Sequence, residues 1–314
     1  ADGIAIAAYE IMAAVTLIVI GKFLLPIMID RKIFTIPQFL HERYNDGVGL
    51  AFSILWLFLY VFVNLTSVAW LGALAIEQIL GVQGVMVSFG GFEISMQMLI
   101  IIGLFVVAGI YSIYGGLASV AWTDVMQVTF LVGGGLITAY AALDVIAASL
   151  DIEGGALGAL GQIYGELIQN PDDKHFNLVV TRNEELYPVI NGIVENGVTI
   201  QKADPYFDIP GIVVIVGALW LTNLGYWGFN QYIIQKGLAA KSLAEAKKGM
   251  IFAAFLKILI PFIVCIPGVC AFYIMNSPDC VELRATLAGA IERSDDAYPF
   301  LIRNFTPTIV KGLS

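Results

Sequence analysis

Hydrogen-bonding side chains crowd one apolar stretch of the sequence, residues 210–234, which is long enough to cross a bilayer. The residues with hydrogen-bonding side chains are Thr222, Asn223, Tyr226, Trp227, Asn230 and Gln231, and Gly225 and Gly228 lie among them. Helical spacing would place Asn223, Tyr226 and Asn230 along one face. An aromatic belt at the inner interface explains Trp227 and Tyr232 but not Asn223. Glycines and amides at mid-membrane depth therefore indicate a broken helix that lines a cavity.

Two oppositely charged residues lie inside other apolar stretches. An ionisable side chain at the centre of a span costs about 2.5 to 3.5 kcal/mol on insertion scales, so each needs a partner, water or an escape to the interface. Glu10 either reaches the outer headgroups or accepts hydrogen bonds in a solute cavity. Lys257 lies about 12 Å inside its stretch at the helical rise, and either snorkels to the inner face or enters the same cavity.

Two further polar residues have a structural and a functional interpretation. Asn64 lies near the middle of residues 49–80, where an amide commonly joins helices by hydrogen bonds. Asp124 lies near the inner end of residues 117–150, where a carboxylate stabilises a helix N-terminus. Both residues could instead have a functional role.

The chemistry that these groups offer together is recognition of a neutral, polyhydroxylated solute. Each hydroxyl both donates and accepts hydrogen bonds, which suits amides, and an aromatic ring can stack on a sugar ring. Glu10 and Lys257 can balance each other's charge, whereas an ionic solute would require an unpaired charge. The three cysteines lack metal-ligand spacing and there are only two histidines, so a zinc site, a disulfide framework and a Ser/His relay are not expected.

The elements that carry these residues are predicted to be membrane-spanning helices. Of the 314 residues, 59% are hydrophobic and only 13% are charged, where a soluble domain has about a quarter charged residues. Lipid cannot satisfy an open sheet edge, so the spans should be helical. The sequence predicts an all-α membrane protein with six transmembrane helices at residues 4–29, 49–80, 96–113, 117–150, 210–234 and 249–274.

The charged residues between the spans set the expected orientation. Residues 22–43 and 236–248 are rich in Lys and Arg and should be cytoplasmic, whereas residues 81–97 contain no base and should be outside. Residues 151–209 form a long acidic, extracellular loop, and the sequence leaves open whether this loop is ordered. Both ends of the chain are then extracellular or periplasmic, and residues 276–310 form an extracellular segment that leads to a further helix.

Three segments resemble the solute:sodium symporter family, and within it the sodium/glucose and sodium/galactose cotransporter branch. They are Tyr111-Ser-Ile-Tyr-Gly-Gly-Leu-Ala-Ser-Val-Ala-Trp-Thr-Asp124-Val-Met-Gln, Asn223-Leu-Gly-Tyr-Trp-Gly-Phe-Asn-Gln-Tyr-Ile-Ile-Gln and Phe255-Leu-Lys257. The likeness extends from Tyr9 almost to Ser314. It implies a fold of two inverted five-helix repeats, of which residues 1–314 would be a single, partial transmembrane domain. We therefore expect the chain to be a fragment that lacks the main sodium site.

The resemblance also implies roles for individual residues. The sugar ligands carry over to Glu10, Asn64, Asn223 and Lys257, and Tyr226 is implied as the ring that stacks on the sugar. Tyr9 matches an outer-gate aromatic, and Trp227 lies beside the inner gate formed by Tyr226. Asp124 matches a carboxylate associated with cation coupling.

The implied function is sodium-coupled secondary active symport of a sugar, a hexose such as glucose or galactose, across the plasma membrane, the inner membrane of a bacterium. Sodium is the expected co-transported ion, and a small sugar and the lipid bilayer are the expected partners. No enzymatic activity is expected, and with 16 basic against 25 acidic residues no nucleic-acid partner is expected. The alternatives are a symporter of the same family for inositol, a nucleoside, proline or pantothenate, and a membrane solute sensor. The sequence does not determine the oligomeric state.

Overall fold

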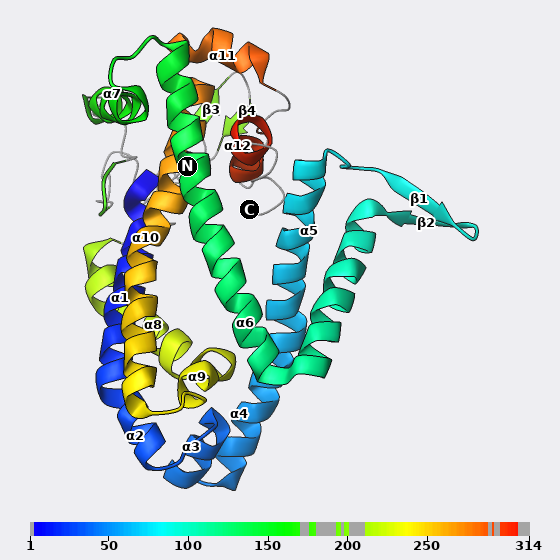
Figure 1. Cartoon of the computed structure of the whole chain (residues 1–314), viewed down its shortest axis with the longest axis vertical. Coiled ribbons are helices and arrows are strands. Elements are labelled where there is room, and N and C mark those ends of the chain that lie inside the picture. Colours follow the sequence, from blue (N-terminus) through cyan, green and yellow to red (C-terminus); the bar gives the residue numbers. More distant parts are fainter. Residues whose placement is uncertain are drawn as a thin grey trace.

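The computed structural model describes residues 3–169, 176–179, 193–195, 198–200, 211–287, 291 and 296–306, which are almost entirely helical (Figure 1). The helices of the first half are η1 (Gly3–Ile6), α1 (Ala7–Val19), η2 (Ile20–Leu24), α2 (Leu25–Asp30), α3 (Ile36–Arg43), α4 (Asp46–Phe58), η3 (Leu59–Leu65), α5 (Thr66–Leu80), α6 (Met96–Ser149) and α7 (Gly155–Gln169). Those of the second half are η5 (Val214–Ala218), α8 (Leu219–Gly228), α9 (Gln231–Leu238), α10 (Leu243–Asn276), η6 (Pro278–Cys280), α11 (Val281–Thr286) and α12 (Ala297–Phe305).

Two short antiparallel hairpins accompany the helices. One pairs β1 (Met86–Phe89) with β2 (Phe92–Ser95), and the other pairs β3 (Ile193–Glu195) with β4 (Val198–Ile200). Gly90 and Gly91 connect β1 to β2, and both have positive φ angles, 59° and 90°. A tight hairpin turn requires this backbone conformation, which glycine adopts without steric cost. The first hairpin joins α5 to α6, in the segment that the sequence assigns to the outside.

Four helical segments among the described residues are long and apolar enough to cross a membrane. They are Ile4–Asp30, Asp46–Leu80, Met96–Ser149 and Leu243–Asn276. Three of them match the predicted spans at residues 4–29, 49–80 and 249–274, although the last begins six residues earlier, at the Ser242 cap. Side chains of Thr35, Asn45, Ser95 and Ser242 accept hydrogen bonds from the first turns of α3, α4, α6 and α10, which defines where these helices begin.

The longest segment, α6, contains two of the predicted spans. Its backbone leaves the helical region at Gly116, where φ is 54° and ψ is −153°. Only glycine adopts this combination readily. Figure 1 shows α6 turning back on itself above the end of the molecule that α2 and α3 form, and the non-helical backbone at Gly116 separates residues 96–113 from 117–150 as predicted.

The predicted fifth span is broken, as the sequence indicates. Helix α8 ends at Gly228, Asn230 has an extended backbone, and α9 begins at Gln231. The expectation that Asn223, Tyr226 and Asn230 share one helical face is wrong for Asn230, because the helix ends before this residue. Helical periodicity cannot be extended across a break.

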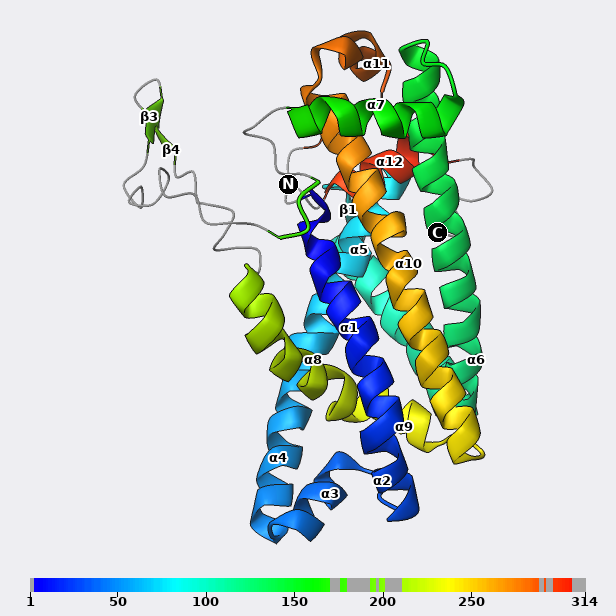
Figure 2. The same ribbon diagram turned by 90° about the vertical axis from the view of Figure 1, so that its left-hand side faces the viewer.

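Two buried clusters hold the helices together, and α10 contributes to both. The cluster on the α7 side joins the second half of α6, α7, the end of α10, η6 and α12. The other joins α1, η2, α2, α9 and the first half of α10. Figures 1 and 2 both show α1 beside α10, and Figure 1 shows α4, α5 and the first half of α6 splaying away from them.

The predicted outer loop is ordered over its first part, because α7 spans Gly155–Gln169 and lies across the end of the helical bundle (Figure 2). The rest of residues 151–209 is described only at 176–179, 193–195 and 198–200. In the predicted segment 276–310, η6, α11 and α12 are described. The further helix expected after residue 310 lies outside the described residues.

Candidate functional site

An ion pair joins the two apolar helices that pack most extensively, α1 and α10. Lys257 Nζ lies 2.7 Å from Glu10 Oε2, and about a quarter of each side chain is exposed. Each charge therefore has the other as its partner in the structure. The pair is neutral overall, which lowers the cost of placing two charges at membrane depth.

Trp227 and Asn223 of α8 extend the site from the lysine. Lys257 Nζ lies 4.8 Å from the centre of the Trp227 ring, within the range of a cation–π contact. Trp227 Nε1 donates to Asn223 Oδ1 at 3.2 Å, and Asn223 Nδ2 donates to the carbonyl of Leu219 at 2.9 Å. The buried amide is therefore held in one orientation by groups of its own helix.

A chain of aromatic residues connects α8 across its break to the second span. The ring of Tyr226 meets that of Trp227 edge-on, and its hydroxyl lies 2.9 Å from the hydroxyl of Tyr232 in α9. The Tyr60 hydroxyl donates to Asn230 Oδ1 at 2.6 Å, and the Tyr60 ring packs edge-on against Tyr232. The break between α8 and α9 is thus tied by side chains to η3.

The proline at residue 261 adds a backbone acceptor near the ion pair. A proline inside a helix has no N–H to donate to the carbonyl four residues earlier, which here is that of Lys257. A carbonyl, an amide, a carboxylate, an ammonium group and two aromatic rings thus lie along α1, α8 and α10. This set can donate hydrogen bonds to the hydroxyl groups of a neutral polyol and accept hydrogen bonds from them.

Two of the residues assigned by resemblance lie apart from this cluster. Asn64 is half-buried in η3, whose main packing neighbours are α4 and α5, and none of the hydrogen bonds that the structure gives among its described residues joins it to Glu10, Asn223 or Lys257. It shares the π-helical turn with Tyr60, which does reach the α8–α9 break. Tyr9 precedes Glu10 on α1 and is exposed.

Asp124 is not part of the Glu10–Lys257 pair. It forms an ion pair with Lys236 of α9, and both side chains are partly exposed. The pair links the second half of α6 to the helix that follows the break. An N-terminal helix carboxylate is therefore an incomplete explanation of Asp124, since its charge has a specific basic partner.

Sequence reasoning missed Tyr60, Lys236 and Pro261. Tyr60 lies four residues before Asn64, so the two share a helical face, and this spacing was the available signal. Lys236 lies in a segment of several basic residues, none of which is distinguished by composition. Pro261 follows Lys257 by four residues, a spacing that could have been read from the sequence.

Comparison with known proteins agrees with the membrane fold. The whole chain, residues 1–314, matches the family described as the sodium:solute symporter family. It is 42% identical over 315 residues to a sodium/glucose cotransporter of Vibrio parahaemolyticus. This alignment covers 99% of this chain and 50% of that protein. It is 29% identical to the sodium/myo-inositol cotransporter 2 of Bos taurus, over all of this chain and 42% of that protein. It is also 29% identical to sodium/glucose cotransporter 4 of Mus musculus, with the same coverage.

The chain spans about half the length of the curated relatives that it matches. The match nevertheless includes every described helix, the broken α8–α9 segment and both members of the Glu10–Lys257 pair. The chain belongs to the sodium:solute symporter family, whose members are integral membrane transporters that take sodium as the co-transported ion.

Proposed function

We propose that this chain forms part of a sodium-coupled symporter that carries a neutral sugar, a hexose such as glucose or galactose. The observation that supports this most strongly is the Glu10–Lys257 ion pair beside Trp227 and Asn223. A self-neutralised pair leaves no net charge to bind an ion, but it offers strong donors and acceptors to hydroxyl groups. The sugar-named relatives support the same substrate class.

In this proposal Glu10, Asn64, Asn223 and Lys257 bind the sugar, and Tyr226 stacks on its ring. Tyr226 and Trp227 close the inner path, and Tyr9 closes the outer one. Asp124 acts in cation coupling, and sodium must then compete with Lys236 for this carboxylate. Asn64 is the member with the least support, because η3 reaches the α8–α9 break through Tyr60 rather than through the amide.

The proposed architecture is six transmembrane helices belonging to two inverted five-helix repeats, with residues 1–314 as a partial domain. The break in α8–α9 supports it, because discontinuous helices at the midplane are typical of inverted-repeat transporters. We propose that residues 151–209 and 276–310 are extracellular and that both ends of this chain face outward. The membrane is the plasma membrane, the inner membrane in a bacterium.

Transport in this scheme is driven by sodium. One monovalent cation crossing 100 mV releases about 2.3 kcal/mol. A tenfold concentration gradient adds about 1.4 kcal/mol. Sodium stabilises the outward-open state, the sugar binds at the midplane, and the helices rock to release both inside.

The test is uptake of labelled sugars by the full-length protein in liposomes, with and without a sodium gradient. Hexose uptake should require sodium and should be lost in Lys257→Ala and in Tyr226→Ala. Lys248→Ala is the matched control for the first variant, because Lys248 lies on the same helix and its side chain is 74% exposed. Tyr140→Ala is the control for the second, since Tyr140 lies on α6 and is 62% exposed.

A second candidate substrate is myo-inositol, a cyclic polyol with the same hydroxyl chemistry, because several relatives are named for its cotransport. Uptake of inositol in preference to hexoses would assign the chain to that substrate. Sodium-driven uptake of proline or pantothenate without sugar would overturn the sugar proposal, and uptake independent of sodium would overturn symport.

A further inference from the structure

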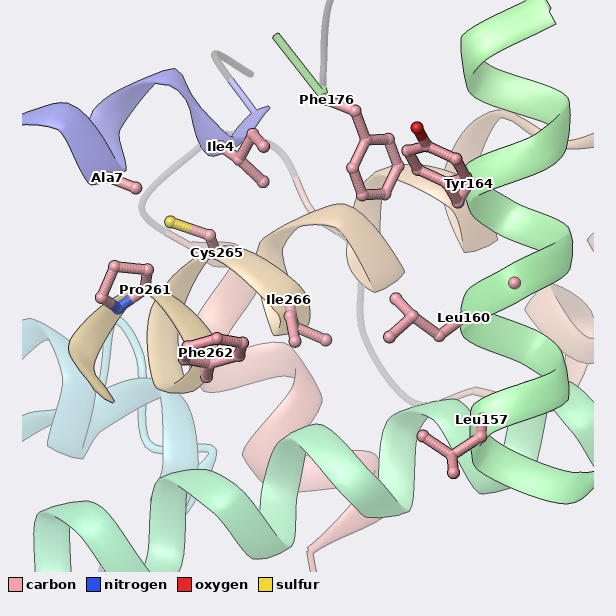
Figure 3. Close-up of a pocket in the computed structure, with 11 residues that line it drawn as sticks. Ile4, Ala7, Leu157, Leu160, Tyr164, Phe176, Pro261, Phe262, Cys265 and Ile266 are labelled. Atoms are coloured by element: carbon pink, nitrogen blue, oxygen red, sulfur yellow. The ribbon is translucent and has the colours of Figure 1, made fainter. Parts of the chain in front are cut away.

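A large apolar pocket lies between the start of α1, helix α7 and the middle of α10 (Figure 3). Its volume is about 510 Å³, within the range of small-molecule sites. It is lined by Ile4, Ala7, Leu157, Leu160, Gly161, Tyr164, Phe176, Pro261, Phe262, Cys265 and Ile266. None of these side chains is charged. The pocket therefore suits an apolar ligand rather than a polyol, whose hydroxyl groups would lose their hydrogen bonds there.

The pocket lies next to the ion pair but is separate from it. Ala7 precedes Glu10 by three residues on α1, and Pro261 follows Lys257 by four residues on α10. These spacings are about one helical turn, so the pocket lies about 5 Å closer to α7 than the ion pair does. Figure 1 shows α7 on the outer flank of the bundle, on the side away from α4 and α5.

Helix α7 has the character of a helix that lies in the membrane interface. It buries Ala156, Ala159 and Ile163 against the bundle. Leu157 is nevertheless 80% exposed at the mouth of the pocket. On its polar side Gln162 donates to Glu166 at 2.8 Å. A helix with an exposed apolar side and a polar side is stable where hydrocarbon meets headgroups.

Two aromatic rings form one wall of the pocket. Tyr164 and Phe176 meet edge-on with their centres 5.1 Å apart, and Figure 3 shows both rings together on the α7 side of the pocket. Tyrosine is enriched at the headgroup level of membranes, because its ring is apolar and its hydroxyl is polar. A tyrosine in this wall therefore fits a pocket at the level where headgroups meet hydrocarbon.

We propose that this pocket binds an acyl chain of a membrane phospholipid. The lining is apolar, the mouth is flanked by an interfacial helix, and the family is embedded in the bilayer, so phospholipid chains are the abundant apolar molecules at this depth. The bound chain lies between α1 and α10, one turn from the Glu10–Lys257 pair. The proposal does not depend on which solute is carried.

The test is photo-crosslinking of the full-length protein in phosphatidylcholine vesicles. A small fraction of the phosphatidylcholine carries a photoreactive diazirine in one acyl chain. After illumination, crosslinked peptides are identified by mass spectrometry. Peptides of α7 and α10 that line the pocket should be labelled preferentially over the exposed apolar helices α4 and α5.

Two glycines of α7 provide a matched pair of variants. Gly161 lines the pocket, and a Cβ added there meets no atom within 4 Å, so Gly161→Leu places an apolar side chain at the pocket with no clash at its first carbon. Gly165 lies one turn further along the same helix, has the same free space, and does not line the pocket. Labelling of the pocket peptides should fall about tenfold in Gly161→Leu and stay unchanged in Gly165→Leu.

Three results would overturn the proposal. Equal labelling in the two variants would show that the chain contacts α7 from outside the pocket. Labelling spread evenly over all apolar helices would show ordinary contact with the bilayer. No labelling of pocket peptides in the unaltered protein would show that the pocket is empty or is covered by another segment of the full-length protein.

Discussion

The α1–α10 pair and the α4–α5 segment have nearly the same hydropathy, but the α1–α10 pair buries a larger share of its side chains against protein. Leu17 of α1 is 2% exposed and lies in a buried cluster with residues of α2, α9 and α10. Leu57 of α4 is 65% exposed, and Phe62 of η3 is 64% exposed. Apolar character alone therefore does not distinguish a helix that packs against protein from one that offers its surface to its surroundings.

The location of the polar groups does distinguish the two regions. The α1–α10 pair contains the ion pair and adjoins the buried amide of Asn223. The α4–α5 segment contains Tyr60, whose hydroxyl reaches the α8–α9 break, and it buries Glu77 and Gln78 at the end of α5, while most of its large apolar side chains are exposed. In a membrane protein, packing follows from where polar and small residues are placed, because lipid already satisfies apolar surface.

The largest contrast should appear between leucine truncations in the two regions. Leu17→Ala removes a fully buried side chain and should lower the free energy of unfolding by about 3 kcal/mol. Leu57→Ala removes an exposed one and should change it by less than about 0.5 kcal/mol. Denaturing-detergent titration of the purified protein measures both. An equal loss in the two variants would mean that α4 packs against another part of the full-length protein.

Loss of the lysine from the ion pair should have the next largest effect. Lys257→Met leaves the Glu10 carboxylate uncompensated and should cost about 2 kcal/mol, less than a fully buried pair because both side chains keep some exposure. The same titration measures it, with Lys248→Met as the control. The double variant Glu10→Gln/Lys257→Met should recover most of the stability. Failure to recover would show that Lys257 stabilises the protein through Trp227 rather than through Glu10.

Two glycines of α6 compare the packed and the open face of a single helix. A methyl group at Gly135 would lie 2.1 Å from Ile263 Cγ2, and Ile263 is 2% exposed in α10. Gly135→Ala should therefore cost about 2 kcal/mol through overpacking. Gly133→Ala meets no atom within 4 Å and should stabilise the helix by up to about 1 kcal/mol. Thermal unfolding in detergent compares them, and a stabilised Gly135→Ala variant would contradict the close approach of α6 and α10.

The smallest effect is expected for the ion pair that joins the second half of α6 to α9. Lys236 and Asp124 are 44% and 35% exposed, so their coupling free energy should be below about 1 kcal/mol and should decrease with added salt. A double-mutant cycle of Lys236→Ala and Asp124→Asn measures this coupling. A value above about 2 kcal/mol would indicate a desolvated pair with a structural role.

Much of the helix layout could be predicted from the sequence. The spans at residues 4–29, 49–80 and 249–274, the separation between residues 113 and 117 and the presence of a break within residues 210–234 follow from hydropathy and the placement of glycines and amides. The hydropathy of a window and the backbone freedom of a glycine are local properties, because both are set by residues adjacent in the sequence. The single helical face for Asn223, Tyr226 and Asn230 was wrong because a periodicity argument assumes an unbroken helix.

The sequence by itself determined that the chain places a carboxylate, an ammonium group and several amides at membrane depth, and that each needs compensation. The tertiary structure alone decided the partners: Glu10 with Lys257, Tyr60 with Asn230 and Asp124 with Lys236. Each pair is separated by more than 100 residues of sequence, so its formation depends on how the helices are rotated and packed against each other. Hydropathy predicts the depth of a residue in the membrane, but it contains no information on the direction in which the residue points.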